Sequence, residues 1–191
     1  MQLTKRQNEI VDQALSLTAA GGMQNLTVTN LSAALGISEP ALYRHFKNKS
    51  EIVKAMINRF DADVPTEQPG KHGFEAIGAF IQARLEQVCA NPHLARVMFA
   101  EEIFMGESKL YTYLLAMMHK HKAELGGYFA EAQAAGEIQP DIPLDTLYRV
   151  VMGPVRLLIK QWGMSEGGFD LRVKGAELLA VLRKMLKANP A

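Results

Sequence analysis

Apolar residues recur every three or four positions along most of the chain, which is the period of an amphipathic helix. The first such stretch covers residues 4–20. Ile10, Ala14 and Leu17 share one face there, Thr4 is a good N-cap, and a pair of glycines follows the last turn. Helix-forming residues are plentiful and runs of β-branched residues are scarce. The pattern therefore predicts an all-α fold.

Three short helices are expected next. Thr27, Ser38 and Asn48 each precede an apolar stretch of helical period and are good N-caps, and Gly36 can end the first of these stretches in a left-handed conformation. The expected ranges are 27–35, 39–46 and 48–60.

A break follows at residues 64–73, which contain two prolines and two glycines. Longer helical stretches lie beyond it, over residues 74–91, 93–105, 108–135, 143–163 and 170–187. We therefore expect about nine helices in two domains. Residues 1–60 would form an N-terminal three-helix head with a connector helix, and residues 61–191 would form a larger regulatory body.

Composition narrows the class of protein. Hydrophobic residues make up 48% and charged residues 21% of the 191 residues, as in an ordinary globular protein. The first twenty residues are amphipathic rather than continuously apolar, so we expect no signal peptide. No apolar run reaches the length of a membrane span. These observations favour a cytoplasmic protein that does not enter a membrane.

The net charge of +1 conceals a difference between the two parts. Residues 1–60 carry seven basic and four acidic side chains, and the remaining residues carry 14 basic and 16 acidic ones. A basic head on a slightly acidic body is consistent with contact between the head and nucleic acid.

The segment from Leu26 to Lys49 has the pattern of a helix-turn-helix, two short helices joined by a turn at residues 36–38. Ser32 is small enough for the two helices to cross closely. The apolar residues of the segment can form a shared core, which leaves the outer face of the second helix free for a major groove. A helical hairpin with no ligand is the alternative.

Residues 42–49 read Leu-Tyr-Arg-His-Phe-Lys-Asn-Lys. This stretch resembles the helix-turn-helix signature of the tetracycline-repressor (TetR) family, and the resemblance covers roughly residues 8–57. It implies a DNA-binding head of three helices and a connector helix. It also implies a variable helical body that binds a small ligand and forms a homodimer through its last two helices.

The same resemblance assigns roles within the head. Contacts to DNA phosphates are implied for Thr27, Thr29, Tyr43, His45 and Lys49, and contacts to bases for Glu39, Pro40, Ala41 and Arg44. Arg44 is the expected bidentate reader of guanine. Glu39 has two open roles: it can accept a hydrogen bond from cytosine, or it can only stabilise the start of its own helix.

The body is rich in methionine and aromatic residues, which can form an ordinary core or line a cavity for a small, largely apolar or aromatic ligand. The candidate ligand-binding residues are Met98, Phe99, Glu102, Tyr113, Met117, His121, Met152 and Trp162.

No catalytic residue, metal ligand or cofactor is expected. The chain contains no Glu-x-x-His pair of the kind that holds di-iron, and no glycine-rich phosphate loop. His119 and His121 would point about 200° apart on a helix. Cys89 is the single cysteine and is expected to be a small buried hydrophobe. We therefore expect no enzyme activity.

The last two predicted helices have the pattern of a paired hairpin, and Gly153-Pro154 is expected to kink the first of them. Two such hairpins related by a two-fold axis would form a four-helix bundle. The alternative is that both helices only cover the body's own core.

Together these features predict a sequence-specific regulator that binds double-stranded DNA at a palindromic operator, a repressor released by its ligand. Activation is compatible with the same residues. Two further readings remain, a DNA-organising protein without an inducer and a helical ligand carrier or enzyme that ignores DNA.

Overall fold

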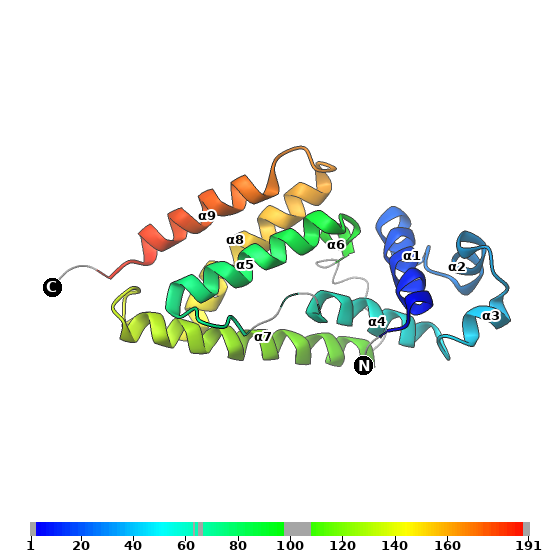
Figure 1. Ribbon diagram of the computed structural model, residues 1–191, viewed down its shortest axis with the longest axis horizontal. Coiled ribbons are helices and arrows are strands. Elements are labelled where there is room, and N and C mark those ends of the chain that lie inside the picture. The colour runs from blue at the N-terminus through cyan, green and yellow to red at the C-terminus, as the bar shows by residue number, and fades with distance from the viewer. Residues whose placement is uncertain (1–2, 63, 65–66, 98–107, 189–191) are drawn as a thin grey trace.

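The computed structural model describes residues 3–62, 64, 67–97 and 108–188, and every regular element in them is a helix (Figure 1). The all-α prediction is therefore confirmed. The helices are α1 (Lys5–Gly21), α2 (Val28–Leu35), α3 (Glu39–Tyr43), α4 (Lys49–Ala62), α5 (Gly73–Ala90), α6 (His93–Val97), α7 (Ser108–Ala134), α8 (Leu144–Met164) and α9 (Leu171–Leu186).

The predicted caps begin the helices of the head. The Thr4 hydroxyl accepts a hydrogen bond from the backbone N–H of Gln7, and the Gln7 side chain accepts one from the backbone N–H of Thr4, which is a complete capping box. The side chains of Thr27 and Ser38 cap α2 and α3 by accepting hydrogen bonds from the backbone N–H groups of Asn30 and Ala41. Local hydrogen bonding therefore sets where these helices start.

Helix α3 is shorter than predicted. It ends at Tyr43 rather than at residue 46, although Arg44 still has helical backbone angles. The carbonyl of His45 accepts a hydrogen bond from the Gln7 side chain of α1 at 3.0 Å, and the Phe46 side chain is buried in the core. The segment that follows α3 is therefore a turn held against α1.

The molecule is elongated, with α2 and α3 at one end and the C-terminus at the other (Figure 1). Helix α1 packs on α2, α4 and α6, so it joins the head to the body. In the body, α5 packs against both α7 and α9, and α8 packs against α7 and α9. Phe80 of α5 and Phe129 of α7 are among the largest fully buried side chains.

The predicted body helices match those observed within one or two residues, except for the stretch 93–105. The structure describes that stretch only as α6, which ends at Val97, and the rest lies outside the described residues. Pro154 lies inside α8, and the helix continues on both sides of it. The predicted boundary segment packs on the body, because Val64 is buried and the backbone N–H of Gln68 donates to the Tyr128 hydroxyl.

Candidate nucleic-acid interface and its connection to the body

Helices α2 and α3 meet at the sharp turn expected of a helix-turn-helix. Gly36 has φ +64° and ψ +33°, a left-handed conformation that glycine adopts without strain. Leu31 of α2 and Leu42 of α3 are buried between the helices, and Ser32 is buried at their crossing. The inner face of α3 is therefore fixed to the head.

The outer face of α3 is open to solvent. Tyr43 is 47% exposed, and Arg44, Glu39 and Pro40 are exposed as well. Thr27 and Thr29 of the second helix are also exposed, and Ala41, His45 and Lys49 are partly exposed. The structure thus places all nine predicted DNA-binding residues in the head, none of them fully buried.

Two of these residues contact each other. The Thr29 hydroxyl donates a hydrogen bond of 2.8 Å to the Glu39 carboxylate, which lies in the first turn of α3. A carboxylate in this position is favourable because it faces the positive end of the helix dipole. In this structure Glu39 therefore ties the start of α3 to α2.

Lys49 is oriented by the head as well. Its Nζ lies 3.4 Å from the backbone carbonyl of Met23, in the turn between α1 and α2. The start of α4 is capped as expected: Asn48 accepts from the backbone N–H of Glu51, and Glu51 accepts from that of Lys47. The ammonium of Lys49 is therefore held beside the N-terminus of α4, an arrangement that suits an anion.

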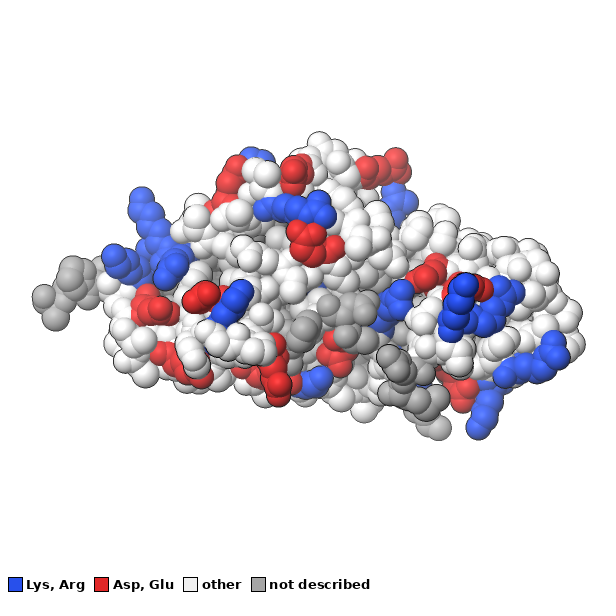
Figure 2. Space-filling view, viewed as in Figure 1, with Lys and Arg blue, Asp and Glu red and all other residues white. Residues whose placement is uncertain are grey.

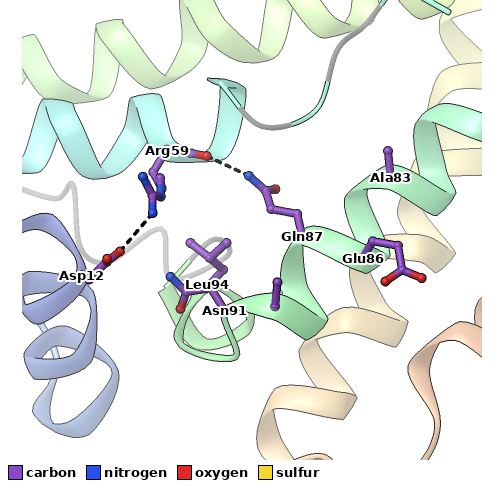
Figure 3. Close-up of a pocket in the computed structure, with 8 residues that line it drawn as sticks. Asp12, Arg59, Ala83, Glu86, Gln87, Asn91 and Leu94 are labelled. Atoms are coloured by element: carbon purple, nitrogen blue, oxygen red, sulfur yellow. Dashed lines mark hydrogen bonds and ion pairs between the residues drawn. The ribbon is translucent and has the colours of Figure 1, made fainter. Parts of the chain in front are cut away.

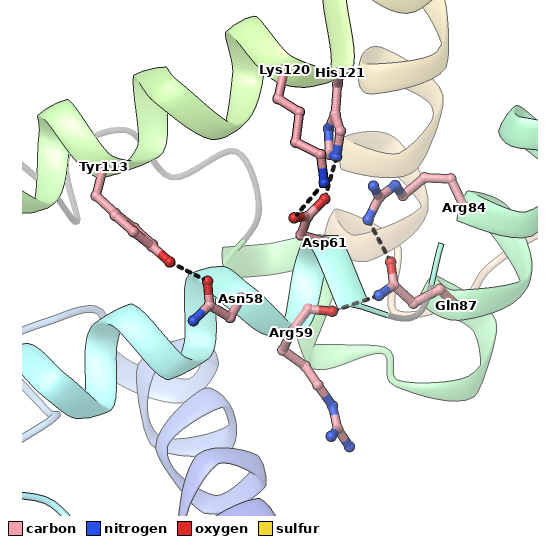
Figure 4. Close-up of polar contacts among 8 residues, drawn as sticks. All are labelled: Asn58, Arg59, Asp61, Arg84, Gln87, Tyr113, Lys120 and His121. Atoms are coloured by element: carbon pink, nitrogen blue, oxygen red, sulfur yellow. Dashed lines mark hydrogen bonds and ion pairs between the residues drawn. The ribbon is translucent and has the colours of Figure 1, made fainter. Parts of the chain in front are cut away.

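The C-terminal end of α4 is attached to the body by polar contacts (Figure 4). The Tyr113 hydroxyl of α7 donates to the Asn58 side chain at 2.5 Å. His121 Nε2 lies 2.6 Å from the Asp61 carboxylate, and Lys120 Nζ lies 3.3 Å from its other oxygen.

Helix α5 holds the same end of α4 from another side. The Gln87 side-chain amide donates to the backbone carbonyl of Arg59 at 2.7 Å, and its oxygen accepts from the Arg84 guanidinium at 2.6 Å (Figure 4). We call this set of contacts the connector clamp. It consists of Asn58, Arg59 and Asp61 of α4 with Arg84, Gln87, Tyr113, Lys120 and His121 of the body.

Most of the connector clamp was not predicted from the sequence. Tyr113 and His121 are the two members that the sequence predicts as functional, and it predicts them as ligand-binding residues. A signal was present in α5, where Phe80, Arg84 and Gln87 follow at spacings of four and three and so share one helix face. Polar side chains on an otherwise apolar face need partners when they are buried, and here the partners lie on α4.

The clamp connects to the head through Arg59. Its guanidinium donates to Asn8 at 2.7 Å and to Asp12 at 3.3 Å, and both of these residues belong to α1. A hollow of about 630 Å³ lies beside this contact, between α1, α4, α5 and α6 (Figure 3). Gln87 and Arg59 line it together with Glu86 and Asn91, so most of the side chains around this hollow are polar.

The structure describes five of the eight predicted ligand-binding residues, and they lie on α7 and α8. Tyr113, Met117 and His121 follow each other at intervals of four on α7, and two of them are held by α4. The Trp162 indole N–H donates to the backbone carbonyl of Phe169, and Met152 is partly buried on α8. Met98, Phe99 and Glu102 lie outside the described residues.

The described part of the chain gives little support for a metal site, a reactive cysteine or a membrane span. In the ranges that the structure covers, no group of three His, Cys, Asp or Glu side chains is placed to hold a metal ion. Cys89 is half-buried rather than fully buried, and this burial raises the pKa of its thiol. No helix among the described residues is long and apolar enough to cross a membrane.

The Asp61 carboxylate gives the clamp a pH dependence. Burial acts to raise the pKa of Asp61, but the hydrogen bonds and positive charges of His121 and Lys120 outweigh it, so the pKa is lowered. A lowered folded-state pKa stabilises the protein above the unfolded-state pKa, and this contribution is lost as pH falls through the folded-state value.

Asp61→Asn is therefore expected to lower the free energy of unfolding at pH 7 by about 1 kcal/mol, because the partly buried ion pair with His121 loses about one charge-assisted hydrogen bond. The difference from the wild type should begin to shrink near the unfolded-state pKa, at about pH 4, and should disappear only below the lowered folded-state pKa, where Asp61 becomes protonated. Urea unfolding at pH 7 and below the folded-state pKa measures this. Asp141→Asn, at an exposed site, is the control, and an Asp61→Asn effect of equal size at both pH values would contradict the assignment.

The geometry defines a fold, a helix-turn-helix head joined to a helical body. Residues 10–56 match the family model described as bacterial regulatory proteins, tetR family. This match confirms the family resemblance predicted from residues 42–49, and the relatives and structural neighbours of the chain are transcriptional regulators.

The chain is also similar to individual proteins in sequence and in fold. The nucleoid occlusion factor SlmA of Glaesserella parasuis is 28% identical over 146 residues, covering 68% of this chain and 73% of that protein. The fatty acid degradation regulator FadR from Bacillus halodurans is similar in fold, with a TM-score of 0.82, 16% identity and coverage of 99% and 100%. FadR from Bacillus subtilis in complex with stearoyl-CoA has a TM-score of 0.75 at 20% identity, covering 94% and 97%.

Proposed function

We propose that this protein is a repressor that binds a roughly palindromic operator as a homodimer and is released by a small, largely apolar ligand. Residues 1–60 are the DNA-binding part with its connector, and residues 61–191 are the regulatory part. The protein acts in the cytoplasm on double-stranded DNA. The observation that carries the proposal is the exposed outer face of α3, whose inner face is buried in the head.

Charge supports DNA binding by this end of the molecule. Residues 1–60 carry seven basic and four acidic side chains, and Figure 2 shows several of these Lys and Arg side chains, with Asp and Glu among them, at the end that carries α1 to α4. We assign phosphate contacts to Thr27, Thr29, Tyr43, His45 and Lys49 and base contacts to Pro40, Ala41 and Arg44. Glu39 has a structural partner in Thr29, so we assign it to the start of α3 rather than to cytosine.

A second exposed surface supports the dimer. Val150, Leu157 and Met164 follow each other at intervals of seven on α8 and are exposed. Helix α9 packs beside α8 and exposes further apolar side chains, Val173, Val181 and Met185. We call these six residues the hairpin face. Large apolar side chains exposed on two neighbouring helices are typical of an interface, and a two-fold axis would bury them against their own copy.

The ligand is proposed from composition and from one neighbour in fold. Met117 and Met152 are partly buried against the core, and methionine adapts readily to apolar molecules. The Bacillus subtilis regulator, which has the same fold, was solved with stearoyl-CoA. Stearoyl-CoA is therefore a reasonable first probe for the body of this protein.

The similarity to a nucleoid occlusion factor supports a second candidate, a DNA-organising protein that has no inducer. Such a protein would bind DNA through the same α3 face, so DNA binding alone does not separate the two candidates. Release by a small molecule does separate them.

Selection of bound duplexes from a random pool tests the proposal. We expect enrichment of a palindrome whose half-site centres lie about one helical turn or a multiple of it apart. Repeating the selection with stearoyl-CoA and, separately, with small molecules extracted from cells should reduce the recovery of that palindrome. Enrichment that nothing reduces would favour the DNA-organising protein, and no enrichment at moderate salt would contradict both candidates.

A further inference from the structure

The start of α1 lies beside the turn that joins α3 to α4, residues 44–48 (Figure 1). We propose that Gln7 of α1 is the positioning residue for the phosphate contact of His45, and that it acts through the backbone of this turn. This role rests on the proposed function, because it requires that His45 contacts DNA.

Gln7 uses both ends of its side-chain amide. The amide oxygen accepts a hydrogen bond of 3.0 Å from the backbone N–H of Thr4, which is one half of the capping box of α1. The amide nitrogen donates a hydrogen bond of 3.0 Å to the carbonyl of His45. A flip of the amide would place a donor against the Thr4 N–H and an oxygen against the His45 carbonyl. The amide is therefore held in one orientation.

The residue type at position 7 matters for this contact. Glu and Gln are equivalent in a capping box, since both can accept from the N-cap N–H. Only Gln also carries N–H groups that can donate to a carbonyl. Gln7 therefore both caps the start of α1 and holds the turn after α3, whereas a glutamate could only cap the helix.

The peptide group that follows His45 is held at both ends. Gln7 donates to its C=O, and its N–H, which belongs to Phe46, donates to the carbonyl of Leu42 at 3.2 Å. The Phe46 side chain is 5% exposed and packs in the core. These contacts leave the backbone at His45 little freedom to rotate, so they fix the direction in which its side chain leaves the turn.

This direction is useful because His45 lies next to the other predicted DNA contacts. It is partly exposed, and it follows Tyr43 and Arg44, which are exposed at the end of α3. The turn is also held after His45, where Glu51 accepts from the backbone N–H of Lys47 at 2.8 Å. A side chain on a backbone that is already ordered loses less conformational freedom on binding, so its contact with a phosphate is stronger.

A double-mutant cycle between Gln7→Met and His45→Ala tests this role. Methionine is unbranched and favours a helix, but it has no N–H to donate to the His45 carbonyl. The affinity for the palindrome that the wild type selects is measured for both single variants and for the double variant. We expect Gln7→Met to reduce this affinity about tenfold, the contribution of about one hydrogen bond in each of two heads.

The His45→Ala background separates positioning from stability. There Gln7→Met should reduce the affinity by less than about twofold, because the side chain that Gln7 positions is absent. A residue that only stabilised the head would have the same effect in both backgrounds. Gln7→Glu keeps the capping box and carries the test if Gln7→Met does not fold. Its added charge acts alike in both backgrounds, so the cycle removes this effect.

Thr4→Ala is the matched control. It removes the hydroxyl that accepts from the backbone N–H of Gln7, and so it weakens the start of α1. It keeps the Thr4 backbone N–H and the contact between Gln7 and His45. Urea unfolding should show a comparable loss of stability in Thr4→Ala and Gln7→Met, but only Gln7→Met should lose affinity for the palindrome.

The positioning role and the proposed function fail separately. Wild-type affinity in folded Gln7→Met, or in folded Gln7→Glu where Gln7→Met does not fold, overturns the positioning role. An undiminished loss in the His45→Ala background overturns it as well, and so does wild-type affinity in His45→Ala alone. A wild-type protein that enriches no palindrome overturns the proposed function itself.

Discussion

Replacing Arg44 with alanine is expected to abolish the preference for operator over random duplex while the dimer remains intact. Arg44 is exposed on the outer face of α3, where a guanidinium can contact a guanine edge with two hydrogen bonds. Each such contact contributes about 1–3 kcal/mol of discrimination, so a dimer with two copies should lose at least about 30-fold in specificity. Competition binding with operator and non-operator duplexes measures this ratio.

Two comparisons make the Arg44 result specific. Lys47→Ala should weaken binding to all duplexes alike and reduce the salt dependence, because Lys47 is exposed beyond the end of α3 and is expected to contact a phosphate rather than a base. Arg172→Ala removes the same charge as Arg44→Ala, but from α9, where Arg172 pairs with Glu86, and should leave specificity unchanged. A specificity ratio that survives Arg44→Ala would mean that α3 does not read the operator.

Leu157→Glu is expected to convert the dimer into monomers. Leu157 lies in the middle of the hairpin face and is 56% exposed in the single chain. In a two-fold dimer the substitution would bury two unpaired carboxylates, and one unpaired buried charge costs about 3–5 kcal/mol. The dissociation constant of the dimer should rise by at least about 100-fold, with a parallel loss of operator affinity. Analytical ultracentrifugation over a concentration series measures the first effect.

Tyr111→Glu is the control for this surface. Tyr111 is 51% exposed and lies on α7, outside the hairpin face. The substitution introduces the same charge at an equally exposed apolar side chain and should leave the dimer intact. If Leu157→Glu is a dimer of wild-type stability, the two copies associate through another surface.

The start of each head helix could be predicted from sequence because a single residue decides it. Thr4, Thr27, Ser38 and Asn48 each accept hydrogen bonds from backbone N–H groups a few positions later, and those contacts depend on nothing beyond one turn of chain. The turn at Gly36 is equally local. The helix-turn-helix was therefore predictable almost completely.

The contact that follows α3 was not predictable, because it involves a distant residue. Nothing between residues 39 and 46 indicates that Gln7, 38 positions earlier, will bind the carbonyl of His45. The connector clamp was not predicted for the same reason. Its hydrogen bonds between α4 and the body join residues 28 to 60 positions apart, and helical period alone says which side chains share a face but not which helix they meet.

The candidate pocket illustrates a related difficulty. Tyr113 and His121 were chosen because large side chains on a helical body often surround a ligand. In the structure they hold α4, and their role toward a ligand stays a prediction. The sequence predicted that this face of α7 matters, but the partner of that face depends on how α4 lies across it.

The clamp also has a thermodynamic consequence. Four polar contacts join α4 to α5 and α7, and a hydrogen bond of this kind is worth about 1 kcal/mol net because water replaces it when it breaks. Opening all four would cost about 4 kcal/mol, half of the roughly 8 kcal/mol that a ligand with micromolar affinity releases on binding. Apolar side chains of α4, among them Met56 and Ile57, are buried in the core, so the four polar contacts are only part of what holds α4 to the body. If the proposed ligand opens only these polar contacts, its binding free energy is sufficient to do so.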